Sequence, residues 1–415
     1  MSEPAVAAKP SPHPGMAFPE FVSLIALVMA LNALAIDAML PALPDIGQAL
    51  GVAVENDRQW VVTAYLLGFG VGQLVYGPLS DRYGRRPLLL WGLSIYTLFG
   101  LAAAVAPSFD LLLLGRFLCG LGAASGRVLA ISIVRDCYEG RTMARVMSLT
   151  FLVFLGVPIL APSLGALILY VADWRVIFFL LAGAGALVLA WAALRLPETL
   201  HPEYRRPIRI PTILDGFRQA LTQRQSVNYA LASTAISGAL FGFIGSSQQI
   251  FADVFQAPGA FPFVFAGIAG AIAVASLTNA RVVERLGSRL VGHSALLGFI
   301  LFSALHAGVA LAGWETMTTF AVLQAATMFC FGLIVGNFGA MAMAPMGHIA
   351  GAASSAQGFV SSIGGALVGF FIGQQFDGTT APLALGFTAC GLAALAFVLL
   401  AERGRLFRAR EARAA

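Results

Sequence analysis

Residues 72–87 read GQLVYGPLSDRYGRRP, a charged turn that follows a run of largely apolar residues. Gly77 and Gly84 are of the type that turns favour, but turn geometry alone does not require the acid Asp81. Three arginines lie close to this acid: Arg82, Arg85 and Arg86. A carboxylate can bind the N-terminus of another helix, where backbone N–H groups are unpaired and the helix dipole is positive. We interpret the run as a conformational latch, against the alternative of a basic turn that only sets membrane orientation.

A second copy of this pattern lies in the other half of the chain. Residues 284–289 read ERLGSR, which has the same acid-Arg-x-Gly-x-Arg form as residues 81–86 and is offset by 203 residues. A weaker echo, Gly-Ala-Leu at 165–167 and 365–367, is offset by 200 residues. A six-helix unit used twice is typical of transporters whose halves rock around a site near the membrane midplane. The repeat therefore predicts two similar halves with a site between them.

The composition is that of a membrane protein. Charged residues make up only 11% of the 415 residues, and hydrophobic residues make up 59%. Soluble domains carry about 25% charged residues, so disordered, fibrous and nucleic-acid-binding classes are disfavoured. A membrane helix needs roughly 20 mainly apolar residues. Twelve segments meet this requirement: 21–43, 58–79, 88–107, 111–134, 147–171, 174–195, 227–251, 260–281, 289–312, 317–343, 353–375 and 381–402. We expect an all-α polytopic protein with twelve transmembrane helices in two six-helix halves.

The basic residues predict the orientation, because positive loops stay in the cytoplasm. Placing both termini in the cytoplasm puts 21 of the 25 Lys and Arg residues on that side. The expected organisation is a disordered cytosolic tail, an N-terminal six-helix half, a cytoplasmic linker, a C-terminal six-helix half and a basic cytosolic tail, over residues 1–20, 21–195, 196–226, 227–402 and 403–415. The basic tail is expected to attach to the anionic cytoplasmic leaflet.

Five short runs resemble the motifs of a known family. The run at 72–87 resembles motif A of the major facilitator superfamily, in the form typical of its drug:proton antiporter branch. The other runs are AIDAMLPALPDI (35–46), GRFLCGLGAASG (115–126), VRD (134–136) and PETL (197–200). Together they are similar to the bicyclomycin/chloramphenicol-resistance (Bcr/CflA) subfamily, and the resemblance covers essentially the whole chain. It implies the major facilitator fold and proton-driven export.

The resemblance also implies roles for the motif A residues. It implies that Asp81 stabilises the outward-facing state through the start of the eleventh transmembrane helix. It further implies that Arg85 pairs with an acid at the end of the fourth helix, here Asp136. The latch and its partner are then expected to comprise Gly77, Asp81, Arg82, Gly84, Arg85, Arg86 and Asp136.

Asp37 is the only carboxylate well inside a predicted membrane segment, and an ionisable residue there indicates a functional site. At about 1.5 Å per residue it lies roughly 6 Å from the outer boundary, and Arg116 lies about 9 Å from the same boundary. The similar depths are compatible with a pair, in which burial favours the neutral acid and the arginine favours the charged acid. We expect Asp37 to take a proton when Arg116 moves away. The alternative is a static ion pair, and the resemblance favours proton coupling because both residues lie in motifs implicated in it.

Segment 147–171 carries four residues that bend a helix or allow close contact: Gly156, Pro158, Pro162 and Gly165. Proline removes a backbone donor and glycine lets a neighbouring helix approach. Membrane helices are generally rich in both residues, so composition alone leaves a generic interpretation open. The run GVPILAPSLGAL (156–167) resembles the antiporter motif C, which favours exchange over symport.

The remaining intramembrane polar residues are candidates for lining a transport cavity: Asn32, Tyr65, Gln73, Arg127, Gln248, Gln249, His306, Gln324, Asn337 and Gln357. Each alone more often forms a helix–helix hydrogen bond than binds a ligand. Arg127 shares a helix face with Arg116 to within about 20°, and it lies near enough to the cytoplasmic boundary to reach water. A structural role and a role in the transport path are equally compatible with this position. Scattered amides and few charges suit an apolar, loosely specified ligand.

No nucleotide-binding motif, metal-ligand cluster or activated nucleophile occurs in the sequence. We therefore expect no enzymatic activity, no metal and no cofactor. The predicted function is proton-coupled efflux of small, mostly apolar drug-like compounds by alternating access, performed by a monomer in the cytoplasmic (inner) membrane of a bacterium. The alternatives are a metabolite symporter or facilitator of the same fold and a non-transporting membrane sensor or scaffold. The expected partners are the drug-like substrate, protons and the lipid bilayer, without nucleic acid.

Overall fold

The computed structural model describes residues 16–205 and 210–407, and every regular element within these ranges is helical. Twelve helices among the described residues are long and apolar enough to cross a membrane, which confirms the predicted all-α, twelve-helix fold. Large apolar side chains lie exposed on the bundle, among them Trp91 (68% exposed) and Tyr170 (88% exposed). A surface of this kind suits lipid rather than water. The chain is a multi-pass membrane protein.

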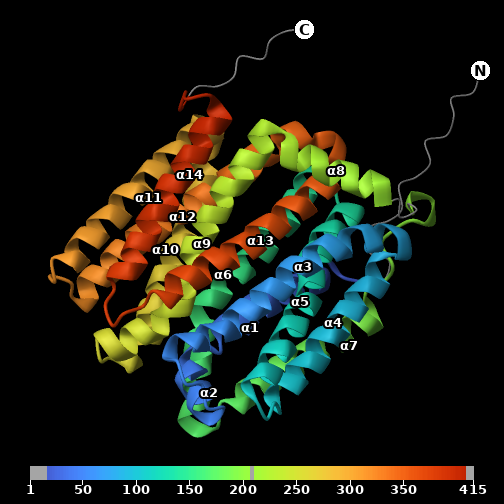
Figure 1. Ribbon diagram of the computed structural model, residues 1–415. Helices are drawn as coiled ribbons and strands as arrows, with labels where there is room; N and C mark the ends of the chain where they lie inside the picture. Colours follow the sequence, from blue (N-terminus) through green and yellow to red (C-terminus); the bar gives the residue numbers. More distant parts are fainter. Residues whose placement is uncertain (1–15, 206–209, 408–415) are drawn as a thin grey trace, which may run out of the picture.

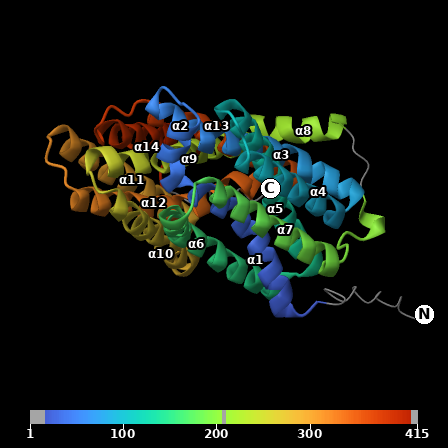
Figure 2. The same cartoon turned by 90° about the horizontal axis from the view of Figure 1, so that it is seen from below.

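The membrane helices divide evenly between two halves, which lie side by side (Figures 1 and 2). The N-terminal half contains α1 (Phe18–Asp37), α3 (Trp60–Tyr83), α4 (Arg85–Ala104), α5 (Phe109–Cys137), α6 (Gly140–Val171) and α7 (Arg175–Arg195). The C-terminal half contains α9 (Arg224–Gln249), α10 (Phe261–Leu286), α11 (Ser288–Leu311), α12 (Met317–Met343), α13 (Ala350–Gln374) and α14 (Ala381–Glu402). Two further helices lie in connections: α2 (Leu43–Ala49) and α8 (Ile210–Thr222). We call the end of the bundle at α8 the linker end and the end at α2 the far end (Figure 1).

α1 ends at Asp37, earlier than the predicted boundary of segment 21–43. Pro41 accounts for the difference, because proline has no N–H to bond the carbonyl of Asp37 and its ring clashes with that carbonyl. The chain continues as a 3₁₀ turn (Leu40–Ala42) that leads into α2. The early stop places Asp37 at the last turn of a helix rather than in its interior.

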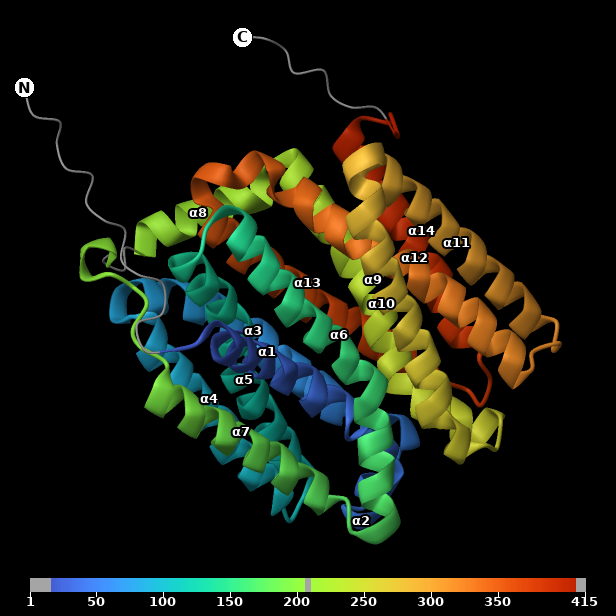
Figure 3. The same ribbon diagram turned by 180° about the vertical axis from the view of Figure 1, so that it is seen from behind.

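The two halves meet along a pair of antiparallel helices, α3 and α13 (Figures 1 and 3). Toward the far end, the ring of Trp60 lies 4.1 Å from that of Phe370, measured between ring centroids. Toward the linker end, a Cβ atom added at Gly77 would lie 3.0 Å from the hydroxyl oxygen of Ser355. α6 packs against α10 as the second pair across the interface. These two pairs are the surfaces over which one half can move against the other.

The linker between the halves contains a helix that packs against the C-terminal half. Within residues 196–226, helix α8 places Phe217 and Ala220 against Met346 and Ala353, near the start of α13. This apolar contact attaches the linker to the C-terminal half. The predicted tails fall largely on residues 1–15 and 408–415, which lie outside the described residues.

Candidate functional site

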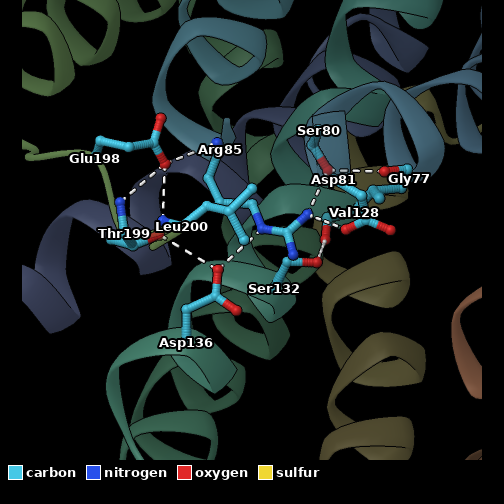
Figure 4. A network of polar contacts seen from close by, with 10 residues as sticks. All are labelled: Gly77, Ser80, Asp81, Arg85, Val128, Ser132, Asp136, Glu198, Thr199 and Leu200. Atoms are coloured by element: carbon cyan, nitrogen blue, oxygen red, sulfur yellow. Dashed lines mark hydrogen bonds and ion pairs between the residues drawn. The ribbon is translucent and has the colours of Figure 1, made fainter. Parts of the chain in front are cut away.

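Arg85 is the centre of a polar network at the linker end (Figure 4). Gly84 makes the turn between α3 and α4 with a φ of 106°, a conformation that side chains disfavour. The guanidinium of Arg85 donates to Asp81 Oδ1 at 2.6 Å, to Ser80 Oγ at 2.7 Å and to Asp136 Oδ2 at 2.9 Å. The Arg85 side chain is only 5% exposed. The structure thus brings three of the residues expected in the latch into direct contact.

Glu198 completes this network, and sequence reasoning did not assign it a role. One carboxylate oxygen, Oε1, accepts hydrogen bonds from the backbone N–H groups of Arg85, Thr199 and Leu200, each at 2.9 Å. Because the first N–H groups of a helix lack intrahelical partners, Glu198 stabilises the start of α4. A side chain at Gly84 would clash with the Glu198 carboxylate. The sequence did offer one indication of this role: Glu198 comes shortly after α7, at the same end of the bundle as the start of α4.

The charged latch residues other than Arg85 also make their contacts within the N-terminal half. Asp81 bonds Arg85 and forms no hydrogen bond or ion pair with the described residues of α13. Arg86 donates to the carbonyl of Ala193 on α7 at 2.6 Å. The guanidinium of Arg82 lies over the ring of Tyr83, 5.3 Å from its centroid. The link from Asp81 to the eleventh transmembrane helix stays a prediction for another conformation.

Arg116 ties three helices together in the interior of the N-terminal half. Its side chain is 1% exposed, and it donates to the carbonyls of Val61 at 3.1 Å and Ala35 at 3.0 Å. Its guanidinium lies 4.4 Å from the ring centroid of Tyr65, whose hydroxyl donates to Asn32 at 3.0 Å. These contacts join α5 to α1 and α3. The candidate lining residues Asn32 and Tyr65 therefore lie in the wall that holds Arg116.

Asp37 does not pair with Arg116 in this conformation. It is 4% exposed and forms no hydrogen bond or ion pair with any described residue. Two backbone carbonyls satisfy donors of Arg116, so the expected contact between the two charges is absent here. Moving an ionised carboxylate out of water without an ion pair is costly. The environment of Asp37 therefore favours the neutral acid.

Helix α6 packs against α1 directly beside Asp37. A Cβ atom added at Gly165 would clash with the carbonyl oxygen of Ala38, and would lie 3.4 Å from Pro41. At Gly156, on the same helix, an added Cβ would meet nothing within 4 Å. The other two residues expected in the hinge, Pro158 and Pro162, lie inside the helix. Among these four residues, Gly165 packs so closely beside Asp37 that a side chain there would not fit.

Four amide side chains join the halves at the far end. Gln59 donates to Gln249 Oε1 at 2.8 Å, and Gln249 donates to Asn56 Oδ1 at 3.0 Å. Asn56 also donates to the carbonyl of Gln374 at 3.2 Å, and Gln374 donates to the carbonyl of Asn56 at 2.8 Å. We call Asn56, Gln59, Gln249 and Gln374 the amide cluster. Only Gln249 was among the predicted lining residues, since the other three lie at or beyond helix ends.

The other candidate lining residues are spread over several helix contacts rather than gathered in one cluster. Gln73 donates to Ser362 Oγ at 2.6 Å across the interface between the halves. Within the C-terminal half, Gln357 donates to Ser226 at 3.0 Å and Asn337 to Asn279 at 2.7 Å. Two more are buried, each with one amide atom that has no hydrogen-bond partner: Gln248 and Gln324. The bonded residues of this group hold helices together.

Arg127 differs from these residues because its side chain is exposed and unpaired. It forms no hydrogen bond or ion pair with a described residue. Ile131, one turn further along α5, is 41% exposed. Arg116, on the same face of α5, is buried. The face that α5 turns inward is therefore closed toward the far end and open toward the linker end.

His306 has an acidic partner that the sequence did not reveal. Its Nε2 lies 2.5 Å from Oε1 of Glu315, with side chains that are 2% and 7% exposed. Thr380 donates to the other carboxylate oxygen of Glu315. The pair attaches the loop before α12 to α11 and α14. Glu315 is in a short loop, where an acid is normally solvated, so no pattern in the sequence indicated its burial.

The described residues bring no three His, Cys, Asp or Glu side chains together as a metal site. All four cysteines are free thiols.

Comparison with known proteins agrees with this geometry. Residues 25–369 match the model of the Major Facilitator Superfamily. The chain is 31% identical over 384 residues to the Bacillus subtilis protein named uncharacterized MFS-type transporter YdgK, covering 90% of this chain and 93% of that protein. It is 27% identical over 388 residues to the bicyclomycin resistance protein homolog of Haemophilus influenzae, with coverages of 92% and 96%. It is 30% identical over 338 residues to multidrug resistance protein MdtL of Klebsiella pneumoniae, with coverages of 80% and 83%.

Among solved structures, the D-xylose-proton symporter is similar in fold. It superposes with a TM-score of 0.71 at 12% identity, over 95% of this chain and 99% of that one. The family model spans most of the chain, and the twelve helices adopt the corresponding fold. The chain belongs to the Major Facilitator Superfamily.

Proposed function

We propose that the protein is a proton-coupled antiporter that exports small, mostly apolar drug-like compounds across the inner membrane of a bacterium. The names of two relatives, a bicyclomycin resistance protein homolog and a multidrug resistance protein, support export of such compounds. One observation carries the proton coupling: Asp37 is a buried carboxylate without a partner. An acid in this position binds a proton readily and releases it only when its surroundings change.

Alternating access follows from the different states of the two ends. The amide cluster closes the far end between the halves, while Arg127 and Ile131 are exposed toward the linker end. The excess of arginines in the loops of the linker end favours the cytoplasm for that side. The conformation then corresponds to a state that opens to the cytoplasm with Asp37 protonated.

The remaining steps use the contacts already described. Release of the proton from Asp37 to the cytoplasm leaves a charge that attracts Arg116, whose present acceptor on α1 is the carbonyl of Ala35. Movement of Arg116 toward Asp37 would break its bonds to α1 and α3 and loosen their packing. Substrate then binds, the amide cluster opens, and Asp81 is free to exchange Arg85 for the start of α13. The proton gradient supplies the energy, and the transporter acts as a monomer without a cofactor.

The test is transport by purified protein in proteoliposomes with an imposed pH gradient, with a fluorescent probe such as ethidium or a neutral antibiotic such as chloramphenicol as substrate. Substrate movement should require the gradient and should be accompanied by proton movement in the opposite direction. Asp37→Asn should abolish the response to the gradient, because the amide cannot take a proton. Asp173→Asn, at an exposed acid of the far end, is the matched control and should behave as wild type.

Other outcomes identify the rival functions. Flux that ignores the gradient would favour a facilitator, and flux in the direction of proton movement would favour a symporter. No flux with any compound would favour a sensor or scaffold. Coupling that persists in Asp37→Asn would remove this residue from the mechanism.

A further inference from the structure

Arg127 is a charged side chain in a membrane-spanning helix that pairs with no acid among the described residues. The side chain is exposed and forms no hydrogen bond or ion pair with a described residue. An arginine that only anchors a helix end would be expected either in an ion pair or bonded to backbone carbonyls, as Arg116 and Arg85 are. Arg127 therefore has five N–H donors available to a ligand.

The packing of α5 shows which way Arg127 faces. Eleven residues separate it from Arg116, a rotation that returns to within about 20° of the same face. Arg116 points between α1 and α3, where it bonds the carbonyls of Ala35 and Val61. Gly126, the residue before Arg127, lies against Val28 of α1, with an added Cβ 2.8 Å from the Val28 carbonyl oxygen. Arg127 thus lies on the face of α5 that turns toward α1 and α3, three helical turns nearer the linker end, and its side chain is exposed there.

No acid faces Arg127 from the opposing helices. The sequences of α9, α12 and α13 contain no Asp or Glu, and neither does α6. On α10 the first acid is Glu284, at the linker end of the helix. Three acids at the linker end of the N-terminal half are already paired: Glu20 with Arg195, and Asp81 and Asp136 with Arg85. These acids therefore leave the charge of Arg127 unpaired.

We propose that Arg127 is a specificity-determining residue that binds an anionic group on the exported compound, such as a carboxylate, sulfonate or phosphonate. The exposed Ile131, one turn away, offers an apolar surface for the rest of such a molecule. A planar guanidinium binds these groups through two parallel hydrogen bonds. The same charge repels cations. This inference rests on the proposed export function and names the substrate class: apolar compounds that carry a negative charge, in preference to cations.

The charge of the substrate has a consequence for energetics. Export of an anion moves negative charge toward the outside, so a membrane potential that is negative inside drives it directly. When a neutral compound is exchanged for the same number of protons, the membrane potential contributes no free energy to the movement of the compound itself. Anionic and neutral compounds should therefore differ by one charge in the electrogenicity of exchange.

The experiment uses three probes with the same apolar body and permanent charge states: naphthalene-2-sulfonate, naphthalene-2-sulfonamide and (2-naphthylmethyl)trimethylammonium. Binding to the purified full-length protein is measured by equilibrium dialysis at one pH. Wild type should bind the sulfonate at least tenfold more tightly than the trimethylammonium compound. Arg127→Gln should lose about tenfold of the sulfonate affinity and leave the sulfonamide affinity within about twofold. Arg127→Lys should retain most of the preference, because it keeps the charge.

The control is Arg218→Gln, an exposed arginine on α8 outside the interior, which should leave all three affinities unchanged. Unchanged sulfonamide binding also shows that the Arg127 variants remain folded. The proposal is overturned if wild type shows no preference for the sulfonate over the trimethylammonium compound, or if Arg127→Gln keeps that preference. Preference lost in Arg127→Gln without any proton exchange in proteoliposomes would refute antiport and leave the anion site standing. Proton exchange with an unchanged charge preference would refute the anion site alone.

Discussion

Arg116 donates a hydrogen bond of 3.0 Å to the backbone carbonyl of Ala35, two residues before Asp37 on α1. The arginine is thus attached to the helix of the proposed proton carrier through the backbone, while the carboxylate itself has no partner. This arrangement separates two tasks. Arg116 holds α1, α3 and α5 together when Asp37 is neutral, and its acceptor Ala35 lies two residues from the carboxylate that would attract it once Asp37 is charged.

Arg116→Lys is expected to destabilise the protein even though the charge is retained. An ammonium group lacks the planar fork with which Arg116 reaches two carbonyls, so the carbonyl of Val61 or of Ala35 would be left without its donor. An unsatisfied buried group costs about 1–3 kcal/mol. Thermal unfolding in detergent should show the loss, with Arg218→Lys, at an exposed arginine of α8, as the control. Equal stability of Arg116→Lys and wild type would contradict the role assigned to these bonds.

Glu198→Ala should destabilise the linker end, whereas Glu198→Gln should retain most of the stability. Alanine removes the acceptor of three backbone N–H groups, and loss of such a helix cap costs roughly 0.5–2 kcal/mol. Glutamine keeps a carbonyl oxygen in the same place. Denaturation curves of both variants provide the measurement, and Glu203→Ala, at an exposed linker acid, is the control. If the alanine and glutamine variants match each other, acceptance of these hydrogen bonds is not what Glu198 contributes.

Gln59→Ala is expected to shift the conformational equilibrium toward opening of the far end. The change removes the bonds of Gln59 to Gln249 and to the carbonyl of Gly373, both of which cross the interface between the halves. A net hydrogen bond contributes about 1 kcal/mol, or roughly a fivefold change in population. Spin-label distances across the far end measure this population, and Gln48→Ala, an exposed residue on α2, is the control. An unchanged distance distribution would show that the amide cluster does not hold the far end closed.

Gly165→Ala should slow transport, while Gly156→Ala should not. An added methyl group at position 165 clashes with the carbonyl of Ala38 and forces α6 away from the end of α1, at a cost of about 1–3 kcal/mol. Position 156 has open space, and alanine there favours the helix by roughly 0.5–1 kcal/mol. Initial transport rates in proteoliposomes compare the two variants. Equal rates would mean that close approach of α6 beside Asp37 is not needed for transport.

Much of the fold could be predicted because its signals are local. Each membrane helix is a continuous apolar run, and lipid requires that backbone groups bond within the helix. The end of α1 is an exception, because Pro41 stops the helix inside an apolar run. Hydrophobicity does not predict this boundary, whereas the missing N–H of proline does. The candidate site was partly predicted as well: Asp37, Arg116 and Arg127 stand out because charges in a membrane segment are rare. Their partners could not be predicted, because a buried arginine is satisfied equally well by a carboxylate or by two carbonyls.

The amino-acid sequence by itself determined that this protein spans a membrane twelve times, that its two halves are related, and that few charges lie within the spans. Hydrophobicity, length and repetition are properties of the chain alone. Only the tertiary structure decided which charges meet: Arg85 with Asp136, Glu198 with the start of α4, and Arg116 with the carbonyl of Ala35. It also decided that His306 has a buried acid beside it and that Arg127 pairs with no acid in the described part of the chain. The physical reason is that ion pairs and hydrogen bonds depend on distances of a few ångströms between helices far apart in sequence, and helix packing sets those distances.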